Sequence, residues 1–316
     1  MEERDERYTP SELVGGVVAG LAAGLVVAAL FQRGKARAAA RLISIADQPA
    51  RYAMQKATND KVALAIETIY EPALLAGKRV LVTGCNRGLG LAIARELQSA
   101  GARVVAAVRT VSPELEALGV QQVITGCEMT SDAAIDAMVA QLDARSLDIV
   151  VNNAGYFRTE RESVLDGTMD FADELKTIDI CAVALLRVSA KLFTAGKLVA
   201  AGAKIAMITS QGGSIAWRDV QSSNGGDYGH HMSKAAANMG SKLLANELKD
   251  SDVAVGILHP GFNRTAMTAK YAHIWDVEGA VDASVGAKRV CHQINRLSIA
   301  TTGEFVNCED GLEIPW

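Results

Sequence analysis

The chain has 316 residues, of which 49% are hydrophobic and 22% are charged, so it can bury a full core and lies far from the composition of disordered proteins. A net charge of -4, with no long basic run in the globular part, argues against a nucleic-acid partner. Its 5 cysteines are scattered, without a CxxC pair or a His/Cys spacing typical of metal ligands, which predicts a reducing compartment and no metal site.

The first distinctive segment is an apolar run at residues 13–31, LVGGVVAGLAAGLVVAALF, which holds no charged side chain. Its length matches the roughly 20 residues that cross a bilayer core. We therefore predict one transmembrane helix, preceded by a polar N-terminal tail at residues 1–12. A cleaved signal peptide is one alternative, but it requires a basic start, whereas MEERDER is mostly acidic. A buried soluble helix is a weaker alternative, because the glycines of the run would destabilise it in water.

A stripe of small residues runs along the predicted span, since Gly16, Gly20 and Gly24 recur at every fourth position. Such a stripe lets a second helix approach closely within the lipid bilayer, so we expect a helix–helix partner. Basic residues follow the span: Arg33, Lys35, Arg37 and Arg41. By the positive-inside rule they place the globular domain on the cytosol-, stroma- or matrix-like side of a membrane. The chain is thus predicted to be a single-pass integral membrane protein, and the sequence does not name the organelle.

Residues 32–76 are predicted to be a helical linker that packs on the globular domain. The clearest helical periodicity runs from Val62 to Tyr70, with Asn59 or Asp60 as its N-cap. We assign this segment no catalytic role.

Residues 77–316 alternate short β-branched runs with helical patterns. KRVLVTG, ARVVAAV, LDIVVNNAG, KIAMITS and VAVGILHPG are predicted strands, and LGLAIARELQSAG and DAAIDAMVAQLDA are predicted helices. Continuous apolar strands that alternate with helices indicate a parallel sheet covered on both faces. The predicted fold class is therefore α/β, a doubly wound parallel sheet of the Rossmann type.

The first predicted strand leads into a glycine-rich turn at residues 83–90, TGCNRGLG, and then into a helix. This arrangement aims backbone N–H groups and a helix N-terminus at a pyrophosphate. With NNAG at 152–155, HPG at 259–261 and the ending DGLEIPW, the domain resembles the short-chain dehydrogenase/reductase family, in its carbonyl-reductase-like branch. The resemblance implies an oxidoreductase that transfers hydride between a nicotinamide dinucleotide and a carbonyl or alcohol.

The candidate cofactor-binding residues lie in and around these motifs: Gly84, Arg87, Gly88, Leu89, Gly90, Arg109, Glu128, Asn153, Ala154, Gly155, Lys234, Pro260, Gly261 and Thr265. Arg109 stands where an NAD-selective site places a carboxylate, and Arg87 adds a second guanidinium. Because a guanidinium suits a 2′-phosphate, NADP(H) is expected over NAD(H). The alternative is that Arg109 is a solvated surface residue. Glu128 occupies the place of the family's aspartate near the adenine.

The catalytic constellation implied by the resemblance is altered at two positions. The family pattern YxxxK aligns with His230 and Lys234, so a histidine replaces the tyrosine that transfers the proton, while the lysine that holds the ribose is kept. Ser210 aligns with the serine that polarises the carbonyl. Asp179 replaces the asparagine that organises a proton-relay water. The family chemistry is therefore in question.

His230 shares a helix face with Lys234, but an imidazole ends roughly 2 Å short of a tyrosine hydroxyl, whereas proton transfer needs a contact of about 2.6 to 3.2 Å. Nearby cations are expected to hold His230 neutral, and neutral imidazole is a poor proton donor. Tyr228 is expected to lie about 240° around the helix from Lys234, so it does not substitute. His231 is expected to be exposed to solvent.

Two functions remain open on the sequence. The first is a membrane-anchored NADP(H)-dependent oxidoreductase of weak activity, in which His230 is an unusual acid. The second is a catalytically inactive accessory or structural subunit of a membrane complex. A substrate pocket would draw on residues 211–227 and on a lid-like region at 262–281. The sequence does not name the substrate, the partners or the oligomeric state.

Overall fold

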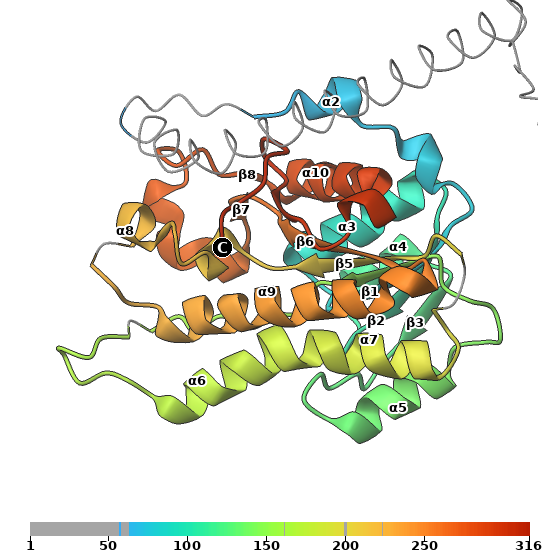
Figure 1. Ribbon diagram of the computed structural model, residues 1–316, viewed down its shortest axis with the longest axis horizontal. Coiled ribbons are helices and arrows are strands. Elements are labelled where there is room, and N and C mark those ends of the chain that lie inside the picture. The colour runs from blue at the N-terminus through green and yellow to red at the C-terminus, as the bar shows by residue number, and fades with distance from the viewer. Residues whose placement is uncertain (1–56, 58–62, 161, 199–200, 223) are drawn as a thin grey trace, which may run out of the picture. The chain divides into compact units, whose positions relative to one another are not determined.

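The computed structural model describes the following residues: 57, 63–160, 162–198, 201–222 and 224–316. A parallel sheet lies between two layers of helices (Figure 1). The predicted polar tail, transmembrane helix and glycine stripe lie outside the described residues. Within the described ranges, no helix is both long enough and apolar enough to cross a membrane.

The main sheet has seven strands in the order β3-β2-β1-β4-β5-β6-β9, and each neighbouring pair is parallel. The bounds are β1 Arg79–Thr83, β2 Arg103–Ala107, β3 Gln122–Ile124, β4 Ile149–Asn152, β5 Lys204–Ile208, β6 Ala254–His259 and β9 Phe305–Asn307. A separate pair consists of β7 Asn263–Arg264 and β8 Val281–Asp282. The strand order reverses between β1 and β4, so the carboxyl ends of these two strands form the switch point at which doubly wound sheets bind ligands.

The helices divide between the two faces of the sheet (Figure 1). One layer contains α3 Gly88–Ser99, α4 Pro113–Leu118 and α10 Ala283–Arg296. The other contains α5 Asp132–Ala140, α6 Phe171–Ile178, the π-helix η2 Asp179–Val183, α7 Ala184–Thr194 and α9 Tyr228–Leu248. The short helices are α2 Ile66–Ile69, η1 Pro72–Leu75, η3 Gln211–Gly213, α8 Arg218–Gln221, η4 Lys249–Ser251, η5 Ala266–Ile274 and η6 Ile299–Thr301.

Local sequence signals set several helix ends. Ser112 caps α4 by accepting a hydrogen bond from the backbone N–H of Leu115, and Pro113 takes the first helical position. Gly119 ends the same helix in the left-handed conformation, at φ 63°. Ser131 caps α5 in the same way as Ser112 caps α4. These caps satisfy backbone donors that a helix start leaves free.

Two hydrophobic cores cover the two faces of the sheet. Successive strand residues point to opposite faces, so Leu81 belongs to the core under α5, α7 and α9, whereas Val80 and Val82 belong to the core under α3 and α10. Every residue of β1, β4 and β6 is buried. This explains why the strands read as continuous apolar runs rather than as alternating ones.

The five strands predicted from the sequence are confirmed, and β3 and β9 were not predicted because each covers only three residues and contains a polar side chain. The prediction of a helix from Val62 to Tyr70 is wrong in its extent, since residues 63–65 are not helical and α2 covers only Ile66–Ile69. The backbone N–H of Leu64 donates instead to the carbonyl of Glu309, at 2.7 Å, which holds this part against the C-terminal segment. The predicted N-cap at 59 or 60 lies outside the described residues.

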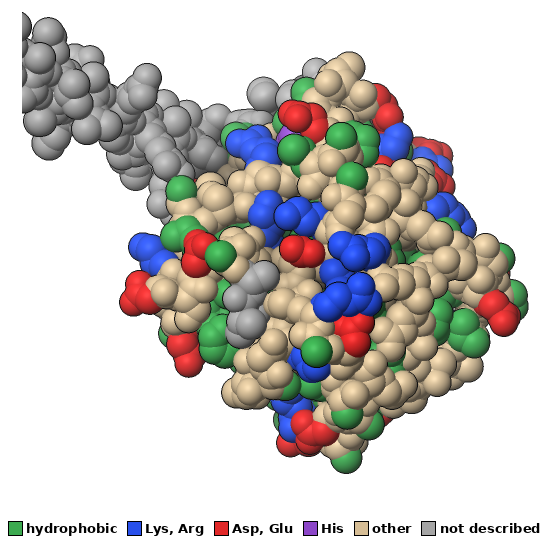
Figure 2. All heavy atoms as spheres, turned by 90° about the vertical axis from the view of Figure 1, so that its right-hand side faces the viewer, with side chains coloured by type: hydrophobic (Ala, Val, Ile, Leu, Met, Phe, Trp, Pro, Cys, Tyr) green, Lys and Arg blue, Asp and Glu red, His purple; other side chains and the backbone are tan. Residues whose placement is uncertain are grey.

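The carboxyl ends and the amino ends of the sheet strands carry different kinds of side chain. The glycine-rich turn and the candidate catalytic residues follow the carboxyl ends of the strands. The opposite side of the molecule, at the amino ends, carries a gathering of lysine and arginine side chains with few acids among them (Figure 2). The sequence alone did not indicate this gathering, because its members come from distant segments.

Candidate functional site

The glycine-rich turn between β1 and α3, which we call the glycine cradle, packs so closely on the residues after β4 that a side chain larger than glycine would clash at Gly84 or Gly90. Gly84 has a φ of +66°, and a Cβ atom on it would lie 2.7 Å from Cα of Ala154. A Cβ on Gly90 would lie 2.3 Å from Nδ2 of Asn153. Gly88, at φ +56°, is exposed at the start of α3, next to the exposed side chain of Arg87. The start of α3 is therefore open to solvent at Gly88, where a phosphate could reach the first turn of the helix.

The ends of β1 and β4 are tied together behind this cradle. The hydroxyl oxygen of Thr83 accepts hydrogen bonds from the backbone N–H groups of Asn153 and Ala154, at 3.0 and 3.1 Å. The side-chain amide of Asn153 donates to the carbonyls of Thr83 and Gly84, each at 3.1 Å. The residues of the NNAG motif thus fix the glycine-rich turn. Thr83 stands first in the motif, but the sequence pattern alone did not indicate this role.

Arg109 and Glu128 lie close together beyond the ends of β2 and β3. The Arg109 guanidinium is 3.5 Å from a Glu128 carboxylate oxygen, and the two side chains are 70% and 43% exposed. An exposed pair of this kind contributes little to stability. Arg109 is therefore a solvated residue as well as a candidate phosphate ligand, and its side chain can turn toward an anion at small cost.

Three of the four candidate catalytic positions are brought together by η3. Ser210 caps η3, and its hydroxyl oxygen accepts from the backbone N–H of Gly212 at 2.9 Å. A Cβ on Gly212 would lie 2.9 Å from Nε2 of His230, and one on Gly213 would lie 2.6 Å from the backbone carbonyl oxygen of Lys234. The two glycines therefore let η3 pack directly on α9. The Nζ atom of Lys234 donates to the carbonyl of Ile208, at 3.2 Å.

His230 is partly buried. Its ring packs edge-on against Phe157, with ring centroids 4.8 Å apart, in addition to its contact with Gly212. Burial, and then the charge of Lys234, holds the pKa of His230 well below its usual value. The imidazole is therefore neutral near pH 7. It can offer one N–H donor but not a readily released proton.

The prediction that His231 is exposed to solvent is wrong. Its side chain is partly buried, with Nδ1 at 2.9 Å from the carbonyl oxygen of Gly212. The Arg218 guanidinium, which cannot give up its proton, lies 3.0 Å from Nδ1 and 3.3 Å from Nε2. Arg218 also donates to the carbonyls of Ser214 and Gln211. His231 is partly buried because Arg218, the first residue of α8, packs against its ring.

Asp179 forms an ion pair with Arg187 of α7. Its carboxylate accepts from both terminal nitrogens of Arg187, at 3.1 Å. The same guanidinium donates to Asp132 and to the carbonyl of Met129, which draws the carboxylate toward the start of α5. The role of Asp179 at a proton-relay water stays a prediction. Asp179 is the first residue of the π-helix η2, and its carboxylate is held by the ion pair with Arg187.

The HPG segment after β6 completes the cofactor side. Gly261 has a φ of +84°, and a Cβ on it would lie 2.5 Å from Cγ of Glu309. Glu309 is buried and forms an ion pair with Arg289 at 3.4 Å. The side chain of Thr265 reaches the glycine-rich turn, since a Cβ on Gly88 would be 3.7 Å from it. Two predicted cofactor segments thus meet in space.

The lid-like region at 262–281 is bound to Asp227, the residue before α9, by two side chains. Lys270 of η5 donates to the Asp227 carboxylate at 2.8 Å, and the Tyr271 hydroxyl donates to the other oxygen of the same group. The Lys270 ammonium also lies 4.0 Å from the ring centre of Phe157. Asp227 has a φ of 48°, which is unusual for a residue other than glycine. These contacts of Asp227 with Lys270 and Tyr271 were not predictable from the sequence, because the residues are more than 40 positions apart.

A pair of buried carboxyl groups lies under the first turn of α9. Glu162 and Glu174 are each only 4% exposed, and the backbone N–H of Gly229 donates to Glu162 at 3.1 Å. Gly229 also lets α6 approach, since a Cβ on it would be 2.6 Å from Oε2 of Glu174. Burial, then the neighbouring Glu162 and Asp173, raises the pKa of Glu174 to about 7, although Arg158 acts in the opposite direction. Glu174 is therefore only partly ionised at neutral pH.

This pair predicts a pH dependence of stability. The pKa of Glu174 in the folded state lies above its ordinary value of 4.5. Below pH 4.5 the contribution of this protonated group to the free energy of unfolding is therefore complete, and it is lost as the pH rises to about 7. The loss is about 1 to 3 kcal/mol. Glu174→Gln should remove this slope and raise the unfolding midpoint at pH 8, as measured by thermal unfolding between pH 5 and 8. The exposed Glu116→Gln is the control, and an unchanged slope in Glu174→Gln would contradict the assignment.

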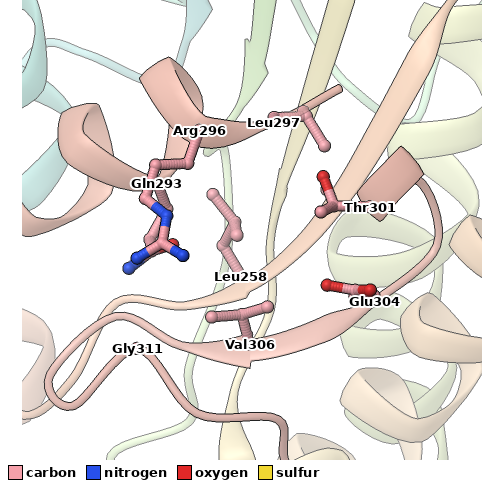
Figure 3. A pocket seen from close by; sticks show the side chains of 9 residues that line it. Leu258, Gln293, Arg296, Leu297, Thr301, Glu304, Val306 and Gly311 are labelled. Atoms are coloured by element: carbon pink, nitrogen blue, oxygen red, sulfur yellow. The ribbon is translucent and has the colours of Figure 1, made fainter. Parts of the chain in front are cut away.

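A separate small pocket lies between β6, β9 and the end of α10 (Figure 3). Leu258, Leu297 and Val306 give it apolar walls, and Arg296 and Glu304 bring opposite charges to it. None of its lining residues belongs to the glycine-rich turn or to the candidate catalytic positions. The pocket is therefore not the candidate active site.

Comparison with known proteins fixes the family. The family model described as short chain dehydrogenase matches residues 78–274, which is more than half of the chain. The chain belongs to the short-chain dehydrogenase family. It is 29% identical over 239 residues to 1-hydroxy-2-glutathionyl-2-methyl-3-butene dehydrogenase of Rhodococcus sp. strain AD45, a match that covers 75% of this chain and 99% of that protein. It is also 27% identical to the 3-oxoacyl-acyl-carrier-protein reductase FabG of Escherichia coli, over 68% of this chain and 84% of that protein.

Solved structures of this family share the fold. The NADPH-bound carbonyl reductase from chicken fatty liver superimposes with a TM-score of 0.65 at 24% identity, over 76% of this chain and 100% of that one. At this level of identity the likeness establishes the Rossmann-type fold with its parallel sheet. The predicted fold class of the globular domain is thereby confirmed.

Proposed function

We propose that this short-chain dehydrogenase is a membrane-anchored oxidoreductase that transfers hydride between NADP(H) and a carbonyl or alcohol substrate. The observation that carries the proposal is the convergence of two sites at one sheet edge. Gly84 and Gly90 let the turn pack closely without side chains, so the start of α3 can bind a dinucleotide phosphate, and η3 places Ser210 beside the α9 turn that holds Lys234. The NADPH described in the chicken carbonyl reductase supports the choice of cofactor.

Each residue has a separate task in this proposal. The dinucleotide, when bound, supplies or takes up the hydride. The exposed start of α3 binds its phosphates, and the Lys234 ammonium holds the ribose. The Ser210 hydroxyl donates to the substrate oxygen. His230, being neutral, polarises the same oxygen through one ring N–H, so we expect weak activity.

Membrane anchoring is proposed from the sequence. The apolar run at 13–31 has the length of a bilayer span, and the basic residues after it orient the domain toward a reducing compartment. The glycine stripe of that run supports a helical partner.

The second candidate function is an inactive accessory subunit. The observation that favours it is the environment of His230, which packs on Gly212 and Phe157 where the family places a tyrosine. The pairing of Asp179 with Arg187 points the same way. Under this alternative the domain still binds NADP(H), but it does not turn over a substrate.

The cofactor preference gives the first test. Arg109→Ala should lower the affinity for NADPH at least about tenfold and leave that for NADH nearly unchanged, because a charge-assisted hydrogen bond to phosphate contributes about 1.5 to 3 kcal/mol. Fluorescence titration of both dinucleotides measures the two dissociation constants. Arg95→Ala, an exposed arginine within α3, is the matched control. Equal wild-type affinities for the two cofactors would overturn the NADP(H) assignment.

A further inference from the structure

The amino ends of the sheet strands carry a cluster of cations on the side of the molecule away from the candidate active site. We define the amino-end face by these residues: Lys78, Arg103, Arg145, Lys197 and Lys204. The strand register brings them to one edge, because β2 starts at Arg103 opposite the first residue of β1, and β5 starts at Lys204 opposite the first residue of β4. Figure 2 shows lysine and arginine side chains concentrated on this side of the molecule.

Only part of this positive charge is neutralised. Arg145 pairs with Asp143 at 2.6 Å, and Lys78 lies 3.9 Å from Asp148. The other three cations donate to backbone carbonyls instead. Arg103 donates to Gly77 at 2.8 Å, Lys197 to Leu142 at 3.0 Å, and Lys204 to Ile294 at 2.8 Å. The face is thus cationic in a chain whose net charge is -4.

The cations crowd one another. The pKa of Lys204 is lowered by its burial and then by the charge of Lys78. The pKa of the neighbouring Arg79 is lowered mainly by burial; Asp143 and Asp148 act to raise it, whereas Arg145 and Arg103 act to lower it. An anionic surface against this face would relieve the repulsion.

The spacing of the charges selects the kind of partner. Arg103 on β2 and Lys204 on β5 are separated by three strand spacings, which is about 14 Å. This spread is too wide for one phosphate group and fits an array of headgroups. A partner on this face also leaves the glycine-rich turn, at the opposite ends of the strands, open to solvent.

We propose that the amino-end face docks on the surface of an anionic lipid bilayer. The proposal rests on the membrane location given under the proposed function, since an anchored domain is held within reach of the headgroups. Negative headgroups attract such a face over about one Debye length, which is about 10 Å at 0.1 M salt. Docked in this way, the domain presents its cofactor site to the aqueous phase.

The test uses the full-length chain with a single reporter thiol. Ala144→Cys places a fluorescent label on the exposed loop between Asp143 and Arg145, and Leu165→Cys, at a side chain that is 97% exposed, places one in the loop between β4 and α6. The native cysteines are buried, so the label reacts at the introduced thiol. The protein is reconstituted into vesicles of phosphatidylcholine, alone or with about one third phosphatidylserine. Quenching by spin-labelled headgroups is then measured.

We expect quenching at position 144 in anionic vesicles, little in neutral ones, and loss of the effect at about 0.5 M salt. The label at position 165 should stay unquenched. Lys78→Glu combined with Arg103→Glu should lower the ratio of docked to undocked protein at least about tenfold. The control, Arg95→Glu with Lys176→Glu, reverses two exposed charges on helices α3 and α6 and should change nothing.

Several results would overturn the proposal. These are equal quenching in neutral and anionic vesicles, quenching at position 165 instead, or full quenching in the double variant of the face. A response of the label to soluble polyglutamate, but not to anionic vesicles, would assign the face to an acidic protein. Alkaline carbonate extraction of the same vesicles tests anchoring separately. If carbonate releases the protein, the transmembrane anchor is refuted but the docking proposal is not. Binding of the released protein to fresh anionic vesicles then tests the amino-end face.

Discussion

Gly84→Ala should abolish measurable NADPH binding and lower the stability of the domain. The new Cβ would lie 2.7 Å from Cα of Ala154 and 3.1 Å from its backbone nitrogen, so one of the two strand ends has to move. The φ of +66° adds strain of about 1 to 2 kcal/mol for a residue with a side chain. Overpacking against backbone costs about 1 to 3 kcal/mol more. Because the displaced atoms form the phosphate cradle, we expect the affinity for NADPH to fall at least about 100-fold.

Gly119→Ala is the matched control for this substitution. Gly119 has nearly the same φ, +63°, but a Cβ on it meets nothing within 4 Å. It should therefore show the strain alone, with a small decrease in the thermal midpoint and unchanged NADPH binding. Thermal unfolding and fluorescence titration measure the two effects. If both variants bind NADPH like the wild type, the glycine-rich turn is not the cofactor cradle.

The parts of the fold that were predictable from the sequence are those set by neighbouring residues. The strands of the sheet centre are buried on both faces, so they appear as unbroken apolar runs, and TGCNRGLG stands between a strand and a helix as its chemistry requires. Strands β3 and β9 are too short to produce such a run. The helix before β1 was overestimated, because a tertiary hydrogen bond from Leu64 to Glu309 replaces helical pairing.

The features of the candidate site that the sequence did not predict depend on side-chain pairs that no motif links. Asp179 occupies the expected position in the chain, and the sequence pattern did not indicate that its carboxylate pairs with Arg187. His231 was expected in solvent, yet the inserted helix α8 covers it through Arg218. Asp227 joins the lid only because Tyr271 returns to the start of α9. A motif gives the order of side chains along the chain, whereas charge pairing decides where those side chains point.

His230→Tyr should raise carbonyl reductase activity from a low wild-type level. The phenol would extend roughly 2 Å further than the imidazole and carry a transferable proton next to Lys234, while Ser210 is unchanged. Since a displacement of 1 Å can cost about 100-fold, we expect a gain in kcat/KM of about that size. The measurement is NADPH oxidation with a panel of aldehydes and ketones. Tyr228→Phe is the control, because this phenol is the first residue of α9 and should not contribute.

The outcome decides between the two proposed functions. The added reach of a tyrosine has to be accommodated beside Gly212 and Phe157, so NADPH binding and thermal unfolding must first show that the variant is folded. Adding Asp179→Asn should bring no further gain, because that carboxylate pairs with Arg187. Strong wild-type turnover that His230→Tyr abolishes would show that histidine is a working acid and would exclude the accessory-subunit function. If wild type and both variants bind NADPH but reduce nothing, the domain is an inactive dinucleotide-binding subunit.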